Sequence, residues 1–280
     1  MKYAIDIPNF GHWSDPRHVA ELATQIEEAG WDGLSIWDHI LVWDGNEVAD
    51  PWILLAAAAS ATERITLMNL VAPLPRRHPW KVARETVSID LLSGGRFVLG
   101  VGIGWPTDPE FTTFHQEQDM KVRGDMLDEG LDILNGLWSG RPFSYAGEHY
   151  TLEEVTFLPK PLQEPRIPIW VGGMWPNRRP FRRAAQWDGV AAIGHDGENF
   201  TDIGPKEIGD IVEFIGEHRT SDGPYDVTIA DLWLDDRAKA KDDLAALEAA
   251  GTTWVRESWY PDAGFEYRDW FREVQAGPPR

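Results

Sequence analysis

The sequence contains no cysteine. Disulfides, thiolate metal sites and cysteine nucleophiles are therefore excluded. Basic residues are also scarce, because 26 Lys and Arg stand against 46 Asp and Glu and the formal net charge is −20. Such a surface is a poor partner for nucleic acid and for anionic membranes, so we expect neither. We interpret the excess of acid as a solvated surface that aids solubility.

Long apolar runs are absent as well, and no stretch is long enough to span a membrane. The first apolar run, Tyr3 to Ile7, ends at Pro8 and is too short for the core of a signal peptide. We therefore expect a cytoplasmic protein. The eight histidines lack the spacings typical of metal sites, so no metal is expected. The 15 tryptophans can fill a barrel core, a dimer interface or a pocket for a flat ligand.

The stretch from Thr62 to Trp105 is the most informative part of the chain. An apolar run, Ile65 to Val71, precedes a Pro-rich turn and a helical pattern over Trp80 to Leu92, which Gly94-Gly95 ends. A second apolar run, Arg96 to Val101, follows. This order predicts a strand, a helix and a parallel strand. Chemistry on such a sheet takes place at the carboxyl ends of its strands.

The same alternation continues along the chain, without a linker. Asp15-Pro16 and Asp50-Pro51 are typical helix starts, with a capping side chain before a proline. About eight strand–helix pairs predict a (β/α)₈ TIM barrel that forms a single domain over residues 1–280. The segment Gly140–Pro165 breaks the rhythm and is interpreted as a hairpin or loop inserted after the fourth helix. The alternative is a doubly wound open sheet, which the lack of a GxGxxG at the first helix disfavours.

Polar residues follow two of the predicted strands. Asp38-His39 comes after the second strand, where an imidazole can bind a ligand or move a proton near neutral pH. Alternatively, Asp38 caps backbone groups and His39 is merely packed. Asn69 stands near the end of the third strand and tolerates unusual backbone conformations, although an ordinary strand end is the alternative there.

Glycines end two further strands, in Gly102-Ile103-Gly104 and in Gly172-Gly173. Bare backbone amides at such positions can hold a phosphate. Arginines cluster after the second pair and suggest an anion in a chain this acidic; they are Arg178, Arg179, Arg182 and Arg183. The alternative is a set of tight turns with arginines that pair with surface carboxylates.

Several motifs in this order and spacing resemble the bacterial luciferase-like flavin oxidoreductases. They are WDHI after the second strand, DPWILLAAAASATERITL, PLPRRHPWKVARETVSIDLLSGGRFVLGVGIGW, KPLQEPRIPIWVGG and RRAAQWDG. The resemblance runs from Tyr3 to about Ile193, and GTTWVRESW is similar to the family's last strand. The segment between His195 and Asp236 matches poorly, and its role is not predicted.

The resemblance implies a (β/α)₈ barrel that binds reduced FMN or the deazaflavin F420 at the carboxyl ends of the strands. It implies that Asp38 and His39 lie near the ring and the substrate. It also implies a non-prolyl cis peptide at Asn69-Leu70, behind the ring. By the same match, the ribityl and phosphate groups are held by two segments, Gly102-Ile103-Gly104 and Gly172-Gly173-Met174.

The two cofactors imply different chemistry on a small organic substrate. Reduced FMN reacts with oxygen in a monooxygenase, for which a separate flavin reductase is a possible partner, whereas F420 transfers a hydride directly. A degenerate flavin-binding barrel without turnover is the remaining alternative. The family is commonly dimeric, and the helices over Pro51–Ala61 and Trp80–Leu92 are apolar on more than one face, which predicts a homodimer.

Overall fold

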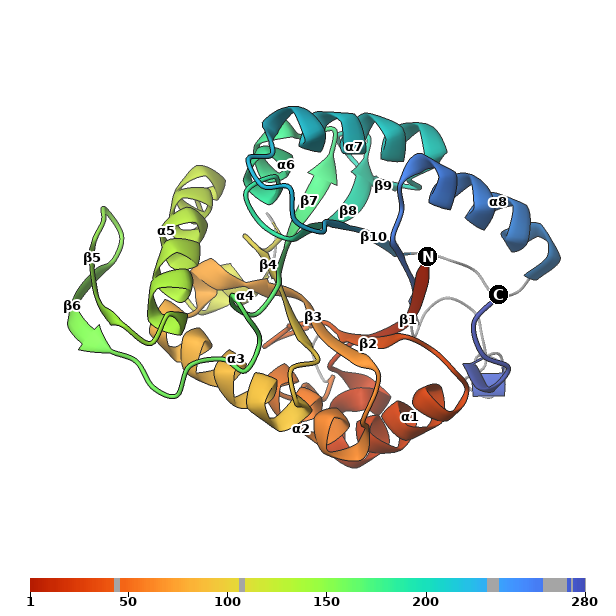
Figure 1. Cartoon of the computed structure of the whole chain (residues 1–280), viewed down its shortest axis with the longest axis horizontal. Helices are drawn as coiled ribbons and strands as arrows, with labels where there is room; N and C mark the ends of the chain where they lie inside the picture. Colours follow the sequence, from red (N-terminus) through yellow and green to blue (C-terminus); the bar gives the residue numbers. More distant parts are fainter. Residues whose placement is uncertain (43–45, 106–108, 231–236, 259–270, 273, 280) are drawn as a thin grey trace.

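Eight parallel strands form a closed ring at the centre of the protein, as the computed structural model shows (Figure 1). The structure describes residues 1–42, 46–105, 109–230, 237–258, 271–272 and 274–279. The ring contains β1 (Lys2–Ile7), β2 (Gly33–Ile36), β3 (Thr66–Pro73), β4 (Phe97–Gly102), β7 (Ile169–Trp175), β8 (Gly189–His195), β10 (Asp226–Ala230) and β11 (Trp254–Ser258).

The ring closes because the first and last strands pair in parallel. Ala4 of β1 pairs with Arg256 of β11 on one side and with Gly33 of β2 on the other. On the far side β10 pairs with both β8 and β11. The predicted (β/α)₈ barrel is therefore confirmed, and the open-sheet alternative is wrong. That the chain behaves as one domain in solution stays a prediction.

Helices surround the ring and connect its strands (Figure 1). They are α1 (Pro16–Glu28), α2 (Pro51–Ala61), α3 (Pro79–Ser93), α5 (Met120–Trp138), α6 (Arg178–Ala184), α7 (Pro205–His218) and α8 (Arg237–Ala250). Aspartate side chains at Asp15 and Asp50 cap the first backbone N–H groups of α1 and α2, as predicted. Helix α3 ends at Gly94, whose positive φ of 67° is the left-handed conformation that glycine allows. No helix in these ranges is long and apolar enough to cross a membrane.

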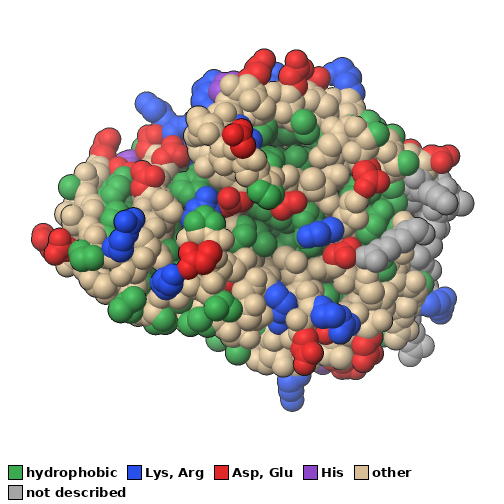
Figure 2. All heavy atoms as spheres, in the orientation of Figure 1, with side chains coloured by type: hydrophobic (Ala, Val, Ile, Leu, Met, Phe, Trp, Pro, Cys, Tyr) green, Lys and Arg blue, Asp and Glu red, His purple; other side chains and the backbone are tan. Residues whose placement is uncertain are grey.

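Apolar side chains fill the interior of the ring. The inward-facing cluster comprises Ala4, Met68, Leu70, Val98, Trp170, Ala191 and Trp254, each at most 7% exposed. In the view of Figure 2, hydrophobic side chains gather over the centre of the ring. The barrel is therefore a packed core with ligand space only at its ends.

The insertion predicted within Gly140–Pro165 is a two-stranded antiparallel hairpin, β5 (Pro142–Ala146) and β6 (Thr151–Thr156). It projects beyond α5, away from the ring (Figure 1). Four short elements were not predicted: η1 (Gly11–Ser14), η2 (Leu74–Arg76), α4 (Pro109–Thr113) and β9 (Phe200–Thr201). The sequence also predicts a last helix over Phe265–Val274, and this segment falls mostly outside the described residues.

Candidate functional site

The carboxyl end of β2 carries a buried carboxylate held by two arginines. Asp38 is 3% exposed. Its Oδ1 atom accepts hydrogen bonds from the Nη2 atoms of Arg76 and Arg77, each at 2.7 Å. Burial alone would lower the pKa of Arg77, but the charge of Asp38 and its hydrogen bond outweigh burial and raise that pKa. Arg77 therefore stays charged, and Asp38 orients both arginines without reaching solvent itself.

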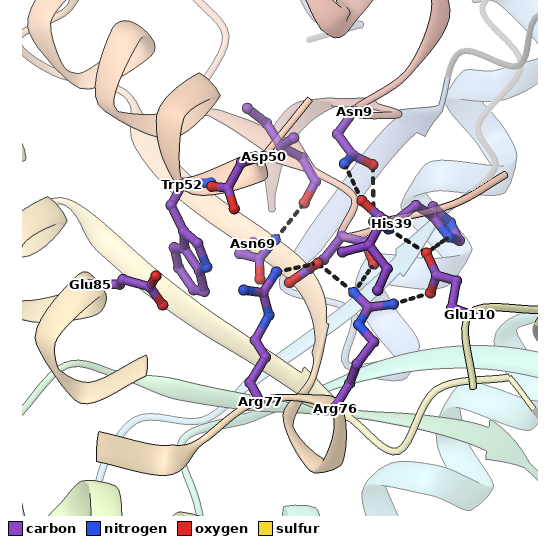
Figure 3. A network of polar contacts seen from close by, with 12 residues as sticks. Asn9, His39, Asp50, Trp52, Asn69, Arg76, Arg77, Glu85 and Glu110 are labelled. Carbon is purple, nitrogen blue, oxygen red and sulfur yellow. Dashed lines mark hydrogen bonds and ion pairs between the residues drawn. The ribbon is translucent and has the colours of Figure 1, made fainter. Parts of the chain in front are cut away.

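A second buried carboxylate, Glu110 of α4, completes this network (Figure 3). It forms an ion pair with Nη1 of Arg76. Its Oε1 atom accepts hydrogen bonds from the backbone N–H groups of Ile40 and Leu41, the latter at 3.0 Å. Glu110 thus fixes the chain after His39 to the loop that follows β4.

His39 is the network's exposed edge. Its side chain is 35% exposed, and its Nδ1 atom lies 3.4 Å from Oε1 of Glu110. Asn9 holds its backbone from both sides, accepting from the His39 N–H at 3.0 Å and donating to its carbonyl at 2.7 Å. The rings of Phe10 and Trp37 lie edge-on to the imidazole, at 5.9 and 6.2 Å between centroids. An imidazole held in this way, beside a carboxylate, can exchange a proton with a ligand.

A bulge at the end of β3 forms the floor beside this edge. The register between β3 and β4 shifts between Asn69 and Ala72. The cis peptide bond implied by the family resemblance is present, but it joins Leu70 to Val71, one residue later than expected at Asn69-Leu70. The correction moves the exposed part of the bulge to Val71, which is half-buried.

The glycines of the neighbouring strands make room for this bulge. A Cβ atom added at Gly102 would lie 2.9 Å from Cγ2 of Val71, and one added at Gly172 would lie 3.2 Å from Cγ1. Gly104 adopts a φ of 77° and packs against the ring of Phe111. The close approach of the β3 bulge therefore accounts for Gly102 and Gly172 without any phosphate.

The other residues predicted to hold the cofactor differ in how deeply they are buried. Asn69 is fully buried and donates to the carbonyl of Ile36 at 3.0 Å, so its side chain ties β3 to β2. Leu70 is 6% exposed. Met174 and Ile103 are half-buried. Of this set, Met174 has the position and exposure to contact a ligand, because it alternates with Trp170 and Gly172 along the inner face of β7.

Gly173 faces the opposite way. A Cβ atom there would lie 2.9 Å from Cβ of Pro180 and 3.1 Å from Cε2 of Phe181, both in α6. A side chain at Gly173 would therefore disturb the packing of α6 and would not point into the barrel mouth. Of the predicted Gly172-Gly173 pair, only Gly172 lies on the inner face.

The cluster of arginines after β7 has partners within the chain. Arg179 pairs with Asp125, and Arg183 pairs with Asp128 and donates to the carbonyl of Gly124 at 2.9 Å. The guanidinium of Arg178 lies 4.1 Å from the ring centroid of Trp175. Arg182 is exposed and makes no ion pair or hydrogen bond with the described residues. Pairing with carboxylates of α5 is the alternative to anion binding, and the contacts of Arg179 and Arg183 favour it.

Aromatic side chains from β8, β9 and the segment after β4 stand together. The rings of Trp105 and Phe200 are 4.8 Å apart, and His195 lies 6.4 Å from Trp105. The His195 Nδ1 atom accepts the N–H of Gly197 at 2.9 Å, so its Nε2 atom is the protonated nitrogen when the ring is neutral. His195 begins the segment for which the sequence predicted no role.

Sequence reasoning missed five residues of the site: Asn9, Val71, Arg76, Arg77 and Glu110. All except Val71 lie in loops or one-turn elements whose neighbours in space are distant in sequence, so no spacing pattern connects them. Pro109-Glu110 is a recognisable helix start, and it was the only available signal for Glu110.

The geometry fits a flat, largely apolar ring with a polar edge. Val71 lies against Gly102 and Gly172, which carry no side chain, and His39 stands at the rim with its imidazole partly exposed. These features belong to a (β/α)₈ barrel, and they make the carboxyl ends of its strands the candidate ligand site.

The family model described as luciferase-like monooxygenase matches residues 5–204. The chain belongs to this family. It is 28% identical over 192 residues to an F420-dependent glucose-6-phosphate dehydrogenase of Microbacterium testaceum, covering 67% of this chain and 56% of that protein. The chain thus spans just over half the length of that curated relative.

Two solved structures share the fold over nearly their whole length. An F420-dependent secondary alcohol dehydrogenase, in complex with an F420-acetone adduct, has a TM-score of 0.78 at 17% identity, covering 98% of this chain and 96% of its own. The oxygenating constituent of 3,6-diketocamphane monooxygenase from Pseudomonas putida, in complex with FMN, has a TM-score of 0.74 at 18% identity, covering 99% and 96%. At these identities the likeness shows the fold alone.

Proposed function

We propose that the protein is an oxidoreductase that binds F420 at the barrel mouth and transfers a hydride to or from a small organic substrate. The observation that carries the proposal is the His39 imidazole, half-exposed beside the bulge at Val71 and 3.4 Å from the buried Glu110 carboxylate. F420 is favoured over FMN because the relative that is 28% identical is named as F420-dependent.

Each residue of the candidate site has its own role in this reaction. Val71, Gly102 and Gly172 provide the flat floor, and Met174 lines its far side. When bound, the reduced cofactor supplies a hydride to the substrate. His39 exchanges the accompanying proton with the substrate oxygen, and the Glu110 carboxylate holds the imidazole in place. Asn9 fixes the His39 backbone, so little reorganisation is needed when a substrate binds.

FMN-dependent oxygenation is the second candidate, favoured by the fold shared with an FMN-binding monooxygenase over nearly the whole chain. In that case a separate reductase would have to supply reduced FMN. A cytoplasmic location and a homodimeric assembly remain predictions. The degenerate barrel without turnover differs from both candidates only in the absence of a reaction.

The test is a pair of equilibrium titrations of the purified protein, one with F420 and one with FMN, followed by cofactor fluorescence. The proposal expects saturable binding of F420 at micromolar concentrations and much weaker binding of FMN. Tighter binding of FMN would select the second candidate. Binding of neither would overturn both.

A further inference from the structure

A buried ion pair lies inside the barrel, below the site just described. Asp6 of β1 and Arg256 of β11 lie on neighbouring strands, with side chains 2% and 5% exposed. Nη1 of Arg256 lies 3.1 Å from Oδ2 of Asp6, and its Nε atom donates to Oγ1 of Thr228 at 3.1 Å. Arg256 follows Trp254 by two positions, so both side chains face the interior.

The two members of the pair differ in how fully they are satisfied. Asp6 accepts hydrogen bonds from Arg256, from the Ser35 hydroxyl, from Nε1 of Trp37 at 2.8 Å and from the Ser258 hydroxyl at 3.0 Å. Four donors saturate a carboxylate. Nη2 of Arg256, by contrast, has no hydrogen-bond partner within the described ranges. A buried guanidinium with unused donors is a ready binding group.

Trp37 connects this pair to the proposed site. Its indole N–H is bound to Asp6, and its ring lies 6.2 Å from the His39 ring. Trp254, 2% exposed, belongs to the apolar cluster that fills the barrel. The pair therefore stands between that apolar cluster and the histidine edge.

The buried charges of these two clusters balance one another within the described residues. The Asp6–Arg256 pair is neutral, and the two carboxylates Asp38 and Glu110 offset Arg76 and Arg77. A carboxylate or phosphate group bound to Arg256 would bring uncompensated negative charge into a buried site, which is costly. A neutral oxygen can accept a hydrogen bond from the free N–H of Arg256 without burying an uncompensated charge.

We infer that Arg256 is a specificity-determining residue that binds a neutral carbonyl or hydroxyl oxygen of the substrate, and that Asp6 disfavours anionic substrates by neutralising it. The inference rests on the proposed function, because it presumes a substrate at this mouth. It assigns the substrate class as ketones or alcohols without an acidic group near the reacting carbon.

The test compares two probes of similar size, cyclohexanone and cyclohexanecarboxylate, by ligand-observed NMR titration of the protein saturated with the cofactor it binds. Wild type should bind cyclohexanone more tightly. Arg256→Gln should lower the affinity for cyclohexanone by about tenfold or more, since one hydrogen bond to a charged group is lost. Asp6→Asn leaves the charge of Arg256 uncompensated and should raise the affinity for cyclohexanecarboxylate by about tenfold.

Two further variants serve as controls. Arg256→Lys keeps the charge and should retain part of the cyclohexanone affinity, so it covers the case in which Arg256→Gln does not fold. Arg166→Gln breaks a more exposed ion pair, with Asp188, that precedes β7 and β8 at the other end of the strands. This variant should change the affinity for neither probe. Thermal unfolding shows which variants are folded.

Cofactor titration distinguishes failure of the proposed function from failure of the role assigned to Arg256. If the protein binds no flavin or deazaflavin, the proposed function fails. If cofactor binds but wild type does not prefer cyclohexanone, or folded Arg256→Gln and Asp6→Asn leave both affinities unchanged, the role of Arg256 is wrong. A change in carboxylate affinity in Asp6→Asn is not expected from a merely structural ion pair.

Discussion

The Nδ1 atom of His39 lies 3.4 Å from Oε1 of Glu110, although the two residues follow different strands of the barrel. The same glutamate oxygen accepts the backbone N–H groups of Ile40 and Leu41. Glu110 therefore fixes both the imidazole and the chain that carries it. This relationship makes the pair, and not His39 alone, the unit on which proton exchange depends.

His39→Ala should slow turnover about 10²-fold or more and leave cofactor affinity within a few fold, because it removes the proton-exchanging group but not the floor. Turnover with the best alcohol or ketone found for wild type, together with a cofactor titration, measures both effects. His149→Ala, in the β5–β6 hairpin, is the matched control and should change neither. Unchanged turnover in His39→Ala would remove His39 from the mechanism.

Glu110→Gln should lower turnover about 10- to 100-fold by misplacing the imidazole. It should also lower the free energy of unfolding by ~1–3 kcal/mol, because Arg76 loses one of its two buried carboxylates but keeps Asp38. Urea unfolding and steady-state kinetics of the same preparation check the two effects. A variant with normal turnover but reduced stability would make Glu110 purely structural.

Substitutions at Gly172 and Gly173 should have opposite effects, because the two residues face opposite sides of β7. Gly173→Ala places a methyl group 2.9 Å from Pro180 and should destabilise the fold by ~1–3 kcal/mol without changing cofactor affinity. Gly172→Ala should weaken cofactor binding more than it lowers stability. The reverse pattern, from urea unfolding and cofactor titration, would mean that the orientation of β7 is wrong.

Exposed leucines along α3 support the predicted homodimer. Leu91, Leu92, Leu158 and Leu162 are 44–60% exposed. The backbone N–H of Leu162 is bound to Asp90 and the carbonyl of Leu158 to Arg84, so this segment lies along the helix. Figure 2 shows hydrophobic side chains in a row over this region. We propose that a second copy of the chain covers them.

Light scattering at micromolar concentration should give a dimer mass for wild type and a monomer mass for Leu91→Glu combined with Leu158→Glu. Val212→Glu, on α7 at the other side of the ring, is the control and should stay dimeric. A monomeric wild type contradicts the proposal.

Much of the barrel could be predicted from the sequence because its signals are local. The boundaries of α5, Met120–Trp138, and α7, Pro205–His218, follow from apolar periodicity between clear start and stop residues. The hairpin insertion and the capping roles of Asp15 and Asp50 are local in the same sense. Strand ends are marked less clearly: the sequence predicts a strand over Pro168–Val171 that Gly172-Gly173 ends, whereas β7 continues through Trp175.

The site was only partly predictable, because its contacts are made between distant segments. Asp38 and His39 could be placed at a strand end, but no local pattern connects them to Arg76 or Glu110. Which face of β7 a glycine occupies depends on register, so Gly172 and Gly173 could not be distinguished. The arginines after β7 had two interpretations until the carboxylates of α5 were placed beside them.

The most direct test of the account is a structure of the protein crystallised with F420, or with FMN if that cofactor binds more tightly. The cofactor ring should lie over Val71, Gly102 and Gly172, with the His39 imidazole at its edge. A ring bound elsewhere on the chain, or one whose edge is remote from His39, would contradict it.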